Sequence, residues 1–288
     1  MRRTPELAPT LWRMDLAGKV IVVTGAASGI GAAIARRCAA ERPAGVIVAD
    51  IDEPGAEKIA AEVEALGAPA RGVRVDVTSS VDVAAMVVLA EATFGPIDVF
   101  VQNAGIAVGG GFDATDAEWD AAWKVNVLSH VIGARAVVPG MIERGGGYLV
   151  HTVSAAGMLS APGAAPYSVT KHAALAFAEQ LAYTHKDQGI RVSALCPMGV
   201  NTPLLMNEDS GLSPTGQAAV LAAGNVIEPE DVADVVIDGI RSERFLMLPH
   251  PEAAQHEHNR ITDRDAYISA MAMYTAFAAD QAAGGDQS

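Results

Sequence analysis

A tyrosine and a lysine stand four residues apart in the middle of the chain, at Tyr167 and Lys171, and Ser154 precedes the tyrosine by thirteen residues. Pro166 suits the first position of a helix, and residues four apart on a helix share a face, so the phenol and the ammonium can be neighbours. A free phenol ionises near pH ~10. A cation about 4 Å away would contribute about 4 kcal/mol, roughly three pKa units. The lysine could therefore make the tyrosine a working acid or base.

Such a pair also occurs by chance on many helices, but a second feature supports a chemical role. The expected first strand, Val20–Thr24, runs into a glycine-rich turn that is followed by a helix. Glycines let the backbone approach a pyrophosphate, and a helix amino terminus offers N–H donors to phosphate. We therefore expect a dinucleotide site that includes Gly25, Ser28, Gly29, Ile30 and Gly31.

The expected second strand ends at Asp50. An acidic residue at this place accepts hydrogen bonds from a ribose 2′-hydroxyl and repels a 2′-phosphate. Residues 51–53 add negative charge and no arginine, which favours NAD over NADP as the cofactor. Asp50 could instead cap a helix, but Asp52 is the better cap for the helix that follows Pro54.

Composition limits the class of protein. The chain has 288 residues, half of them apolar, which suits one large α/β domain or two small ones. A net charge of −14 disfavours nucleic acid and anionic lipid as partners. We expect no apolar run long enough to span a membrane and no secretion signal, and two distant cysteines, Cys38 and Cys196, fit a reducing compartment. These features indicate a cytoplasmic protein that binds neither nucleic acid nor membrane.

Short apolar runs alternate with longer helical patterns along the chain. Strands made of continuous Val and Ile, separated by helices, indicate a parallel sheet covered on both faces. The prediction is a single-domain, doubly wound (Rossmann) α/β fold of about seven strands. The expected strands are Val20–Thr24, Val46–Ala49, Gly72–Val75, Val99–Gln102, Tyr148–Val153, Arg191–Leu195 and Phe245–Leu248. The expected helices are Ile30–Ala40, Gly55–Leu66, Val81–Phe94, Asp116–Ile142, Pro166–Gln188, Pro229–Arg241 and Pro251–Phe277.

The same patterns divide the chain into three parts. Residues 1–14 form an amino-terminal extension, and residues 15–250 form the Rossmann-fold domain, which includes a substrate loop at 203–228. Residues 251–288 form a carboxy-terminal helical extension. Its tail from Ala278 is rich in Ala, Gly and Asp and is expected to fray.

From about Asp15 to Pro249 these landmarks, in their order, resemble the short-chain dehydrogenase/reductase family, and in particular its NAD-preferring alcohol dehydrogenases. The glycine turn resembles the family's TGxxxGxG motif, and the segment from Pro197 to Thr202 resembles its PGxxxT segment, whose threonine holds the nicotinamide carboxamide. The resemblance implies further cofactor contacts from Asp76, Val77, Asn103, Ala104, Gly105, Tyr167, Lys171, Pro197, Gly199, Val200 and Thr202.

Asn126, Ser154, Tyr167 and Lys171 match the family's catalytic tetrad in type, order and spacing. The resemblance implies hydride transfer between the nicotinamide and a carbinol or carbonyl carbon. Tyr167 would exchange a proton with the substrate oxygen, and Ser154 would stabilise the charge that develops there. Lys171 would lower the pKa of the tyrosine and hold the nicotinamide ribose, while Asn126 would anchor a water that passes the proton onward.

One position departs from the family pattern. The glycine that usually follows the proline is Met198, and a glycine appears one place later, at Gly199. Thr202 keeps its offset from Pro197, so we expect the loop to keep its register. The thioether would then lie close to the nicotinamide or the substrate.

The segments expected to form the pocket walls are apolar. No Lys or Arg occurs between Pro203 and Glu228, so a phosphate, coenzyme A or carboxylate substrate would lack an obvious partner. We therefore expect a neutral, largely apolar secondary alcohol or ketone. A cation could still reach over from Arg241, Arg244 or Arg260.

The remaining features concern partners. The helix after Pro166 is apolar nearly all round, so one face can cover the sheet while the other meets a partner subunit, and the Asp116–Ile142 helix could pair beside it. In the family that the chain resembles, these two helices commonly build dimer and tetramer interfaces, which implies a homo-oligomer. The Pro251–Phe277 segment could cover either the pocket or a neighbouring subunit. The spacing of His250, His256 and His258 is loose and no cysteine accompanies them, so we expect no metal site.

Three functions stay open at this point. The favoured one is an NAD-dependent alcohol dehydrogenase. A ketone or 3-oxoacyl reductase working mainly in reverse is disfavoured by Asp50 and by the lack of cations in the substrate loop. A non-catalytic regulator that binds NAD(H) is disfavoured by the complete set of four catalytic-type residues.

Overall fold

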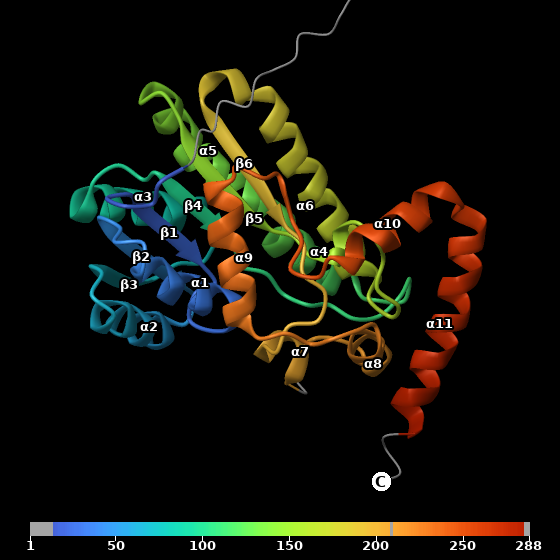
Figure 1. Cartoon of the computed structure of the whole chain (residues 1–288). Helices are drawn as coiled ribbons and strands as arrows, with labels where there is room; N and C mark the ends of the chain where they lie inside the picture. The colour runs from blue at the N-terminus through green and yellow to red at the C-terminus, as the bar shows by residue number, and fades with distance from the viewer. Residues whose placement is uncertain (1–13, 208–209, 285–288) are drawn as a thin grey trace, which may run out of the picture.

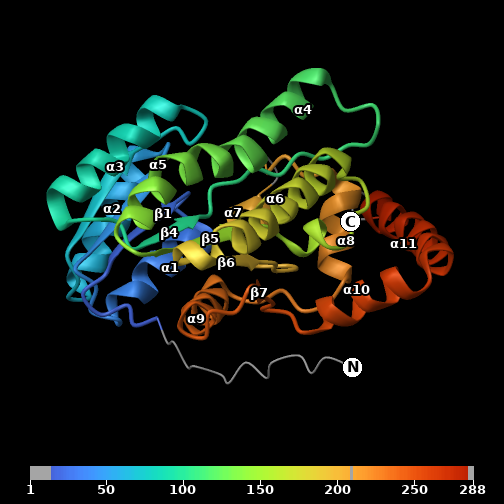
Figure 2. The same cartoon turned by 90° about the horizontal axis from the view of Figure 1, so that it is seen from above.

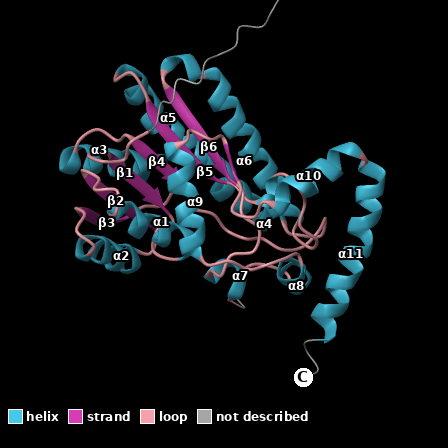
Figure 3. Ribbon diagram, in the orientation of Figure 1, coloured by secondary structure: helices cyan, strands magenta, loops and turns pink. Residues whose placement is uncertain are grey.

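The computed structural model describes residues 14–207 and 210–284, and a parallel sheet of seven strands lies at its centre (Figures 1 and 3). The strand order is β3-β2-β1-β4-β5-β6-β7, with helices on both faces. The expected single-domain, doubly wound fold is therefore confirmed. The strands are β1 Val20–Thr24, β2 Gly45–Asp50, β3 Ala70–Arg74, β4 Val99–Gln102, β5 Gly147–Thr152, β6 Ile190–Leu195 and β7 Leu246–Met247.

Two apolar clusters cover the two faces of the sheet (Figure 2). One cluster joins the strands to α1, α2 and α9, and the other joins them to α3, α5 and α6. The residues of β1, β2 and β4 are almost all buried, which explains their nearly continuous apolar sequences, whereas β3 at the edge of the sheet is only partly buried. The helices are α1 Gly29–Ala39, α2 Glu53–Ala65, α3 Ser80–Phe94, α4 Asp116–Trp123, α5 Ser129–Glu143, α6 Ala165–Thr184, α7 Pro203–Met206, α8 Pro214–Ala222, α9 Pro229–Arg241, α10 Glu252–Thr262 and α11 Arg264–Gly284.

The strand order reverses between β1 and β4. In doubly wound sheets a crevice opens beyond the carboxyl ends of the strands at such a point. The segments that follow β1, β2, β4, β5 and β6 all leave the sheet at this edge, because all the strands are parallel. The topology therefore collects residues that lie far apart in the sequence at one place.

Two expected helices are interrupted. The Asp116–Ile142 helix contains one wide turn of π-helix, Lys124–Leu128, between α4 and α5. The Pro251–Phe277 helix is broken at Asp263, whose carboxylate accepts a hydrogen bond from the Ala266 amide at 2.9 Å and so caps α11.

The carboxy-terminal tail is also more ordered than expected. We expected the chain to fray from Ala278. For residues 278–284 this prediction is wrong, because α11 continues to Gly284 and Ala278 is fully buried. Residues 285–288, and residues 1–13 of the expected amino-terminal extension, lie outside the described part of the chain. The substrate loop 203–228 contains two short helices, α7 and α8, that we did not expect.

The segment Asp116–Glu143 is long and apolar enough, by length and composition, to cross a membrane, with a mean hydropathy of 1.4 over its best window. Our expectation that no such run exists is therefore wrong. Half of that window is buried inside the fold, as in the core helices of globular proteins, which pass the same test. In this structure the segment packs against β4, β5 and α6.

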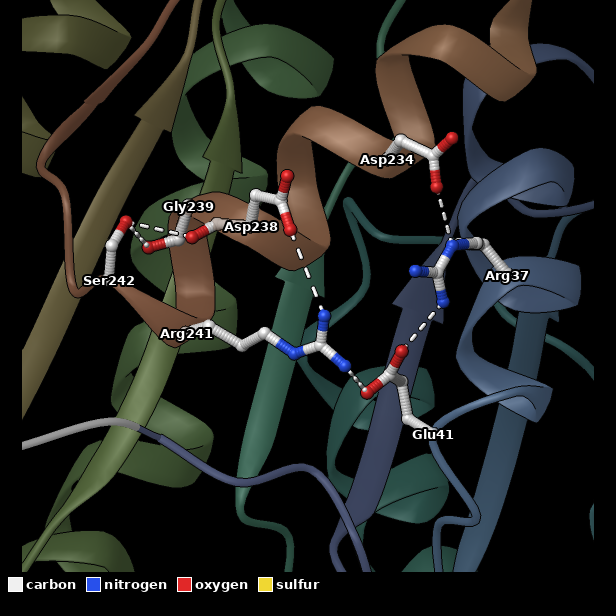
Figure 4. A network of polar contacts seen from close by, with 7 residues as sticks. All are labelled: Arg37, Glu41, Asp234, Asp238, Gly239, Arg241 and Ser242. Carbon is white, nitrogen blue, oxygen red and sulfur yellow. Dashed lines mark hydrogen bonds and ion pairs between the residues drawn. The ribbon is translucent and has the colours of Figure 1, made fainter.

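A polar network joins α1 to α9 on the face of the sheet that these two helices cover (Figure 4). The carboxylate of Glu41 is nearly buried and accepts hydrogen bonds from Arg37 at 2.7 Å and from Arg241 at 2.5 Å. Arg37 also donates to Asp234 on α9 at 2.6 Å. The pKa of Arg37 is raised, chiefly by its hydrogen bond to Glu41. Arg241 is thus paired here and is not a candidate cation for the substrate.

Candidate active site

A cavity of about 1160 Å³ opens beyond the carboxyl ends of the strands. It brings together almost all of the site residues expected from the sequence, from both the dinucleotide turn and the Tyr167 helix. Gly31 and Asn126 are the two that do not line it. The lining includes Gly25, Ser28, Gly29, Ile30, Asp50, Asp76, Val77, Asn103, Ala104, Gly105, Ser154, Tyr167, Lys171, Pro197, Gly199, Val200 and Thr202.

The glycine turn after β1 is too crowded for a side chain at Gly25 or Gly31. Gly25 has a φ of +62°, and a Cβ atom there would lie 2.7 Å from the Cα of Ala104. Asn103 holds the turn by donating from Nδ2 to the carbonyls of Thr24 at 3.0 Å and Gly25 at 3.1 Å. Ser28 precedes α1, and among the described residues its side chain makes no capping hydrogen bond. This cradle at a helix amino terminus fits a pyrophosphate.

The carboxylate of Asp50 is fixed at the edge of the same turn. It accepts hydrogen bonds from the amides of Ala27 at 2.9 Å and Asp52 at 3.0 Å. Asp52 caps α2 by accepting from the Gly55 amide at 3.2 Å, as expected. Asp50 is therefore not a helix cap, and its oxygens keep lone pairs at the edge of a cavity whose described lining residues include no arginine.

Ser154 lies in a sharp bend after β5. Its φ of +152° is rare for a residue with a side chain. Its hydroxyl accepts from the Ala156 amide at 3.1 Å and donates to the carbonyl of Pro197 at 3.5 Å. The Ala155 amide donates to the same carbonyl at 2.8 Å. These bonds tie the bend that carries Ser154 to the start of the Pro197–Thr202 loop.

Lys171 is almost completely buried, and its ammonium donates to the carbonyl of Thr152 at 3.0 Å. The Nζ atom lies 5.6 Å from the centre of the Tyr167 ring. Burial lowers the pKa of Lys171 to about 8. Burial raises the pKa of Tyr167, and the Ser154 hydroxyl acts in the opposite direction.

The expected lowering of the Tyr167 pKa by Lys171 is therefore not found in the protein alone. Lys171 is not among the groups that shift the pKa of Tyr167. Loss of hydration is the main cause of the raised pKa, because an ionised phenol is costly to bury.

Asn126 lies in the π-turn between α4 and α5 and is fully buried. Its amide exchanges hydrogen bonds with the backbone of Ile106, at 2.9 Å and 3.0 Å, and donates to Thr170 at 3.2 Å. A Cβ atom at Gly105 would lie 3.3 Å from both Asn126 Oδ1 and Lys171 Nζ. Asn126 therefore joins the segment after β4 to the helix that carries Tyr167 and Lys171.

The lowered pKa of Lys171 gives a testable stability effect. An unfolded lysine titrates near ~10.4, so between about pH 8 and that value the unfolded chain binds more protons and the folded state gains stability as the pH rises. Relative to Lys171→Met, the wild type should gain about 2 kcal/mol in unfolding free energy between pH 7 and pH 10. Urea unfolding of both proteins measures this, and parallel pH profiles would contradict it.

The carboxy-terminal arm, α10 and α11, forms one wall of the cavity, which is one of the two places that we expected it to cover. In Figure 1 the arm leaves the body of the molecule and α11 passes alongside α8. The hydroxyl of Tyr274 donates to the carbonyl of Ala219 at 2.5 Å. The arm residues that line the cavity are His256, His258, Asn259, Thr262, Asp263, Ala266, Tyr267, Ala270, Met271 and Tyr274.

Arg260 fastens α10 to the body. Its guanidinium donates to the carbonyl of Met158 at 2.6 Å and to the ring of His172 at 3.2 Å. Arg260 is therefore engaged with protein groups, and no sequence signal could have shown this, because its main partner is a backbone carbonyl 102 residues away. Within residues 14–207 and 210–284, no three His, Cys, Asp or Glu side chains gather as metal ligands would.

Comparisons with known proteins agree with this geometry. Residues 19–213 match the model of the short chain dehydrogenase family. The chain is 35% identical to 1-deoxy-11-beta-hydroxypentalenate dehydrogenase of Streptomyces exfoliatus, over 89% of this chain and 92% of that protein. It is 38% identical to 2-(S)-hydroxypropyl-CoM dehydrogenase 3 of Xanthobacter autotrophicus, over 77% of this chain and 89% of that protein. A solved short chain dehydrogenase/reductase from Burkholderia phymatum in complex with NAD superposes with a TM-score of 0.79 at 29% identity, covering 88% of this chain and 96% of that one.

The chain therefore belongs to the short-chain dehydrogenase family. It is an oxidoreductase that uses a nicotinamide cofactor and acts on a hydroxyl group or the corresponding ketone.

Proposed function

We propose that this enzyme transfers a hydride between NAD and a neutral, largely apolar secondary alcohol or its ketone, with Tyr167 as the acid and base. One observation carries the proposal. The dinucleotide turn, the carboxylate of Asp50, the Ser154–Tyr167–Lys171 group and an apolar wall all line a single cavity.

The residues present fit NAD. The cradle from Gly25 to Gly31 would hold the pyrophosphate, and Asp50 would accept hydrogen bonds from the adenosine ribose. Its negative charge would repel the 2′-phosphate of NADP. At the other end, Lys171 would hold the nicotinamide ribose and Thr202 the carboxamide. When bound, the cofactor supplies the hydride acceptor or donor, and the protein supplies its orientation.

The chain's own groups would move the proton. In oxidation, the phenolate oxygen of Tyr167 takes the proton of the substrate hydroxyl, and in reduction the phenol returns it. Ser154 would donate a hydrogen bond to the same substrate oxygen while charge develops on it. The raised pKa of Tyr167 supports a phenol that is protonated near neutral pH, so oxidation should be faster at alkaline pH.

The lining of the cavity supports a neutral substrate. Among the described residues that line it, Lys171 is the one Lys or Arg, and it lies at the reacting end. A carboxylate at the far end of a substrate would have no guanidinium or ammonium to pair with there. The apolar lining residues include Leu159, Met198, Leu204, Leu205, Leu212, Val220 and Met271.

We also propose that the enzyme is a homo-oligomer, a dimer or a tetramer, with its contact on the faces of the α4–α5 segment and α6. Trp123, Val169 and Tyr183 are large apolar side chains from these helices and are 42%, 49% and 71% exposed. Exposed apolar side chains gathered on neighbouring helices favour burial against a second copy.

A matched pair of alcohols tests the substrate class. With NAD present, trans-4-tert-butylcyclohexanol should be oxidised with a kcat/KM at least about tenfold above that of trans-4-hydroxycyclohexanecarboxylate, because only the second compound buries an unpaired charge. The absorbance of NADH measures both rates. An equal or faster rate with the carboxylate would contradict the neutral-substrate proposal. Turnover seen only in the reductive direction and only with NADPH would favour the reductase alternative.

A further inference from the structure

His250 joins three segments around the cavity. It lies between β7 and α10 and is 3% exposed. Its Nδ1 atom is 3.1 Å from the backbone nitrogen of Met198, and its Nε2 atom is 3.1 Å from the carbonyl oxygen of Asn225. An amide can only donate and a carbonyl can only accept, so these partners assign the neutral ring with its proton on Nε2. The carbonyl of His250 also accepts from the Ala253 amide at 3.1 Å, in the first turn of α10.

The hydrogen bond between His250 and the Met198 amide holds one end of the peptide unit between Pro197 and Met198, and the other end of that unit has a partner of its own. The carbonyl of that peptide, on Pro197, accepts from the Ala155 amide at 2.8 Å, next to Ser154. The N–H of the same peptide donates to His250. With both polar ends engaged, the peptide between Pro197 and Met198 has one favoured orientation, because rotation would leave two partly buried groups without partners.

The rest of this loop has other anchors. The amide of Asn201 donates to the carbonyl of Ile227 at 2.9 Å, and the amide of Ile227 donates to the carbonyl of Gly199 at 3.2 Å. His250 therefore holds only the first peptide of the loop, and the later residues of the loop are held by these other hydrogen bonds. Met198 stands where the family pattern has glycine and is one of the residues that line the cavity, so the orientation of this peptide also affects where its thioether lies.

We propose that His250 is a positioning residue for the nicotinamide half of bound NAD and acts through the backbone of Met198. The inference rests on the proposed cofactor. Without an acceptor at Nδ1, the Met198 amide would lose its partner, and the loop that faces the nicotinamide would relax. The adenosine half would be held by the Gly25–Gly31 turn and by Asp50, and no hydrogen bond links His250 to either.

Two substitutions separate the two contacts of the ring. In His250→Asn, the side-chain oxygen lies close to the place of Nδ1 and can still accept from Met198. In His250→Gln, the side-chain nitrogen reaches the place of Nε2 and can still donate to Asn225, but the acceptor for Met198 is lost. Both replace a buried ring by a smaller amide, so each is a control for the loss of packing in the other.

The test compares the binding of NAD with that of ADP-ribose, which lacks the nicotinamide, by calorimetry on the full chain. His250→Gln should bind NAD about tenfold more weakly and ADP-ribose within about twofold of the wild type. His250→Asn should keep both affinities within about threefold. If His250→Gln fails to melt cooperatively, His250→Ser, which removes both contacts, takes its place.

Equal losses for NAD and ADP-ribose, or the same NAD affinity in both variants, would overturn the inference and leave His250 a packing residue. A wild-type protein that binds neither ligand would contradict the cofactor proposal, and the inference would fall with it.

Discussion

Replacing Tyr167 by Phe is expected to lower kcat for alcohol oxidation by about a thousandfold, because a positioned acid–base group contributes about 10² to 10⁴. The ring and its packing stay in place, so NAD should bind within about threefold of the wild type. NADH formation and calorimetric titration of NAD measure the two effects separately.

Tyr183→Phe is the matched control, because it makes the same change on the same helix at a residue that does not line the cavity, and it keeps the apolar ring that we place at the contact between copies. It should leave both quantities unchanged. Turnover in Tyr167→Phe within about tenfold of the wild type would remove Tyr167 from its proposed role. A loss of NAD binding in step with turnover would show instead that the ring mainly shapes the cofactor site.

The second large effect concerns the cofactor. Asp50→Asn removes the charge while the side chain keeps its size and one oxygen acceptor, so the hydrogen bond from the Ala27 amide can persist while that from the Asp52 amide is lost. A hydrogen bond to a charged group is worth about 1.5–3 kcal/mol, roughly 10- to 150-fold. We expect kcat/KM with NAD to fall by at least about tenfold. The ratio of kcat/KM with NAD to kcat/KM with NADP should fall by about a hundredfold, because the repulsion of the 2′-phosphate also disappears.

Asp52→Asn is the control for this change. Asp52 follows Asp50 closely and caps α2, but it does not line the cavity. Asparagine is a good cap, so stability and cofactor preference should both stay close to those of the wild type. An unchanged NAD-to-NADP ratio in Asp50→Asn would mean that another group selects the cofactor.

The features that could be predicted from sequence depend on local chemistry. The glycine turn needs backbone freedom at Gly25 and Gly29, which have positive φ angles, and buried parallel strands need runs of Val and Ile. The parallel topology then brings Asp50, Asn103, Ser154 and Pro197 to one edge of the sheet. Local patterns were sufficient for these parts of the site because each residue follows directly from the end of a strand.

The parts that could not be predicted depend on contacts between distant segments. The turn of π-helix at Asn126 depends on the backbone of Ile106, and the arm is held by Arg260 on the carbonyl of Met158. Backbone carbonyls leave no mark in a sequence pattern. The pKa of Tyr167 was predicted in the wrong direction because spacing alone gives neither the burial of the phenol nor its distance from Lys171. The role of His250 could not be predicted either, because both of its hydrogen-bond partners are backbone groups of distant segments.

The most direct test of the account follows the hydride itself. The wild-type enzyme would be incubated with NAD and trans-4-tert-butylcyclohexanol that carries deuterium on its carbinol carbon, and the NADH formed would be examined by mass spectrometry and proton NMR. Direct transfer at a single fixed nicotinamide face predicts one deuterium in each NADH, all on the same side of C4. NADH without deuterium, or with deuterium on both sides, would contradict hydride transfer between the alcohol and an NAD held as proposed here.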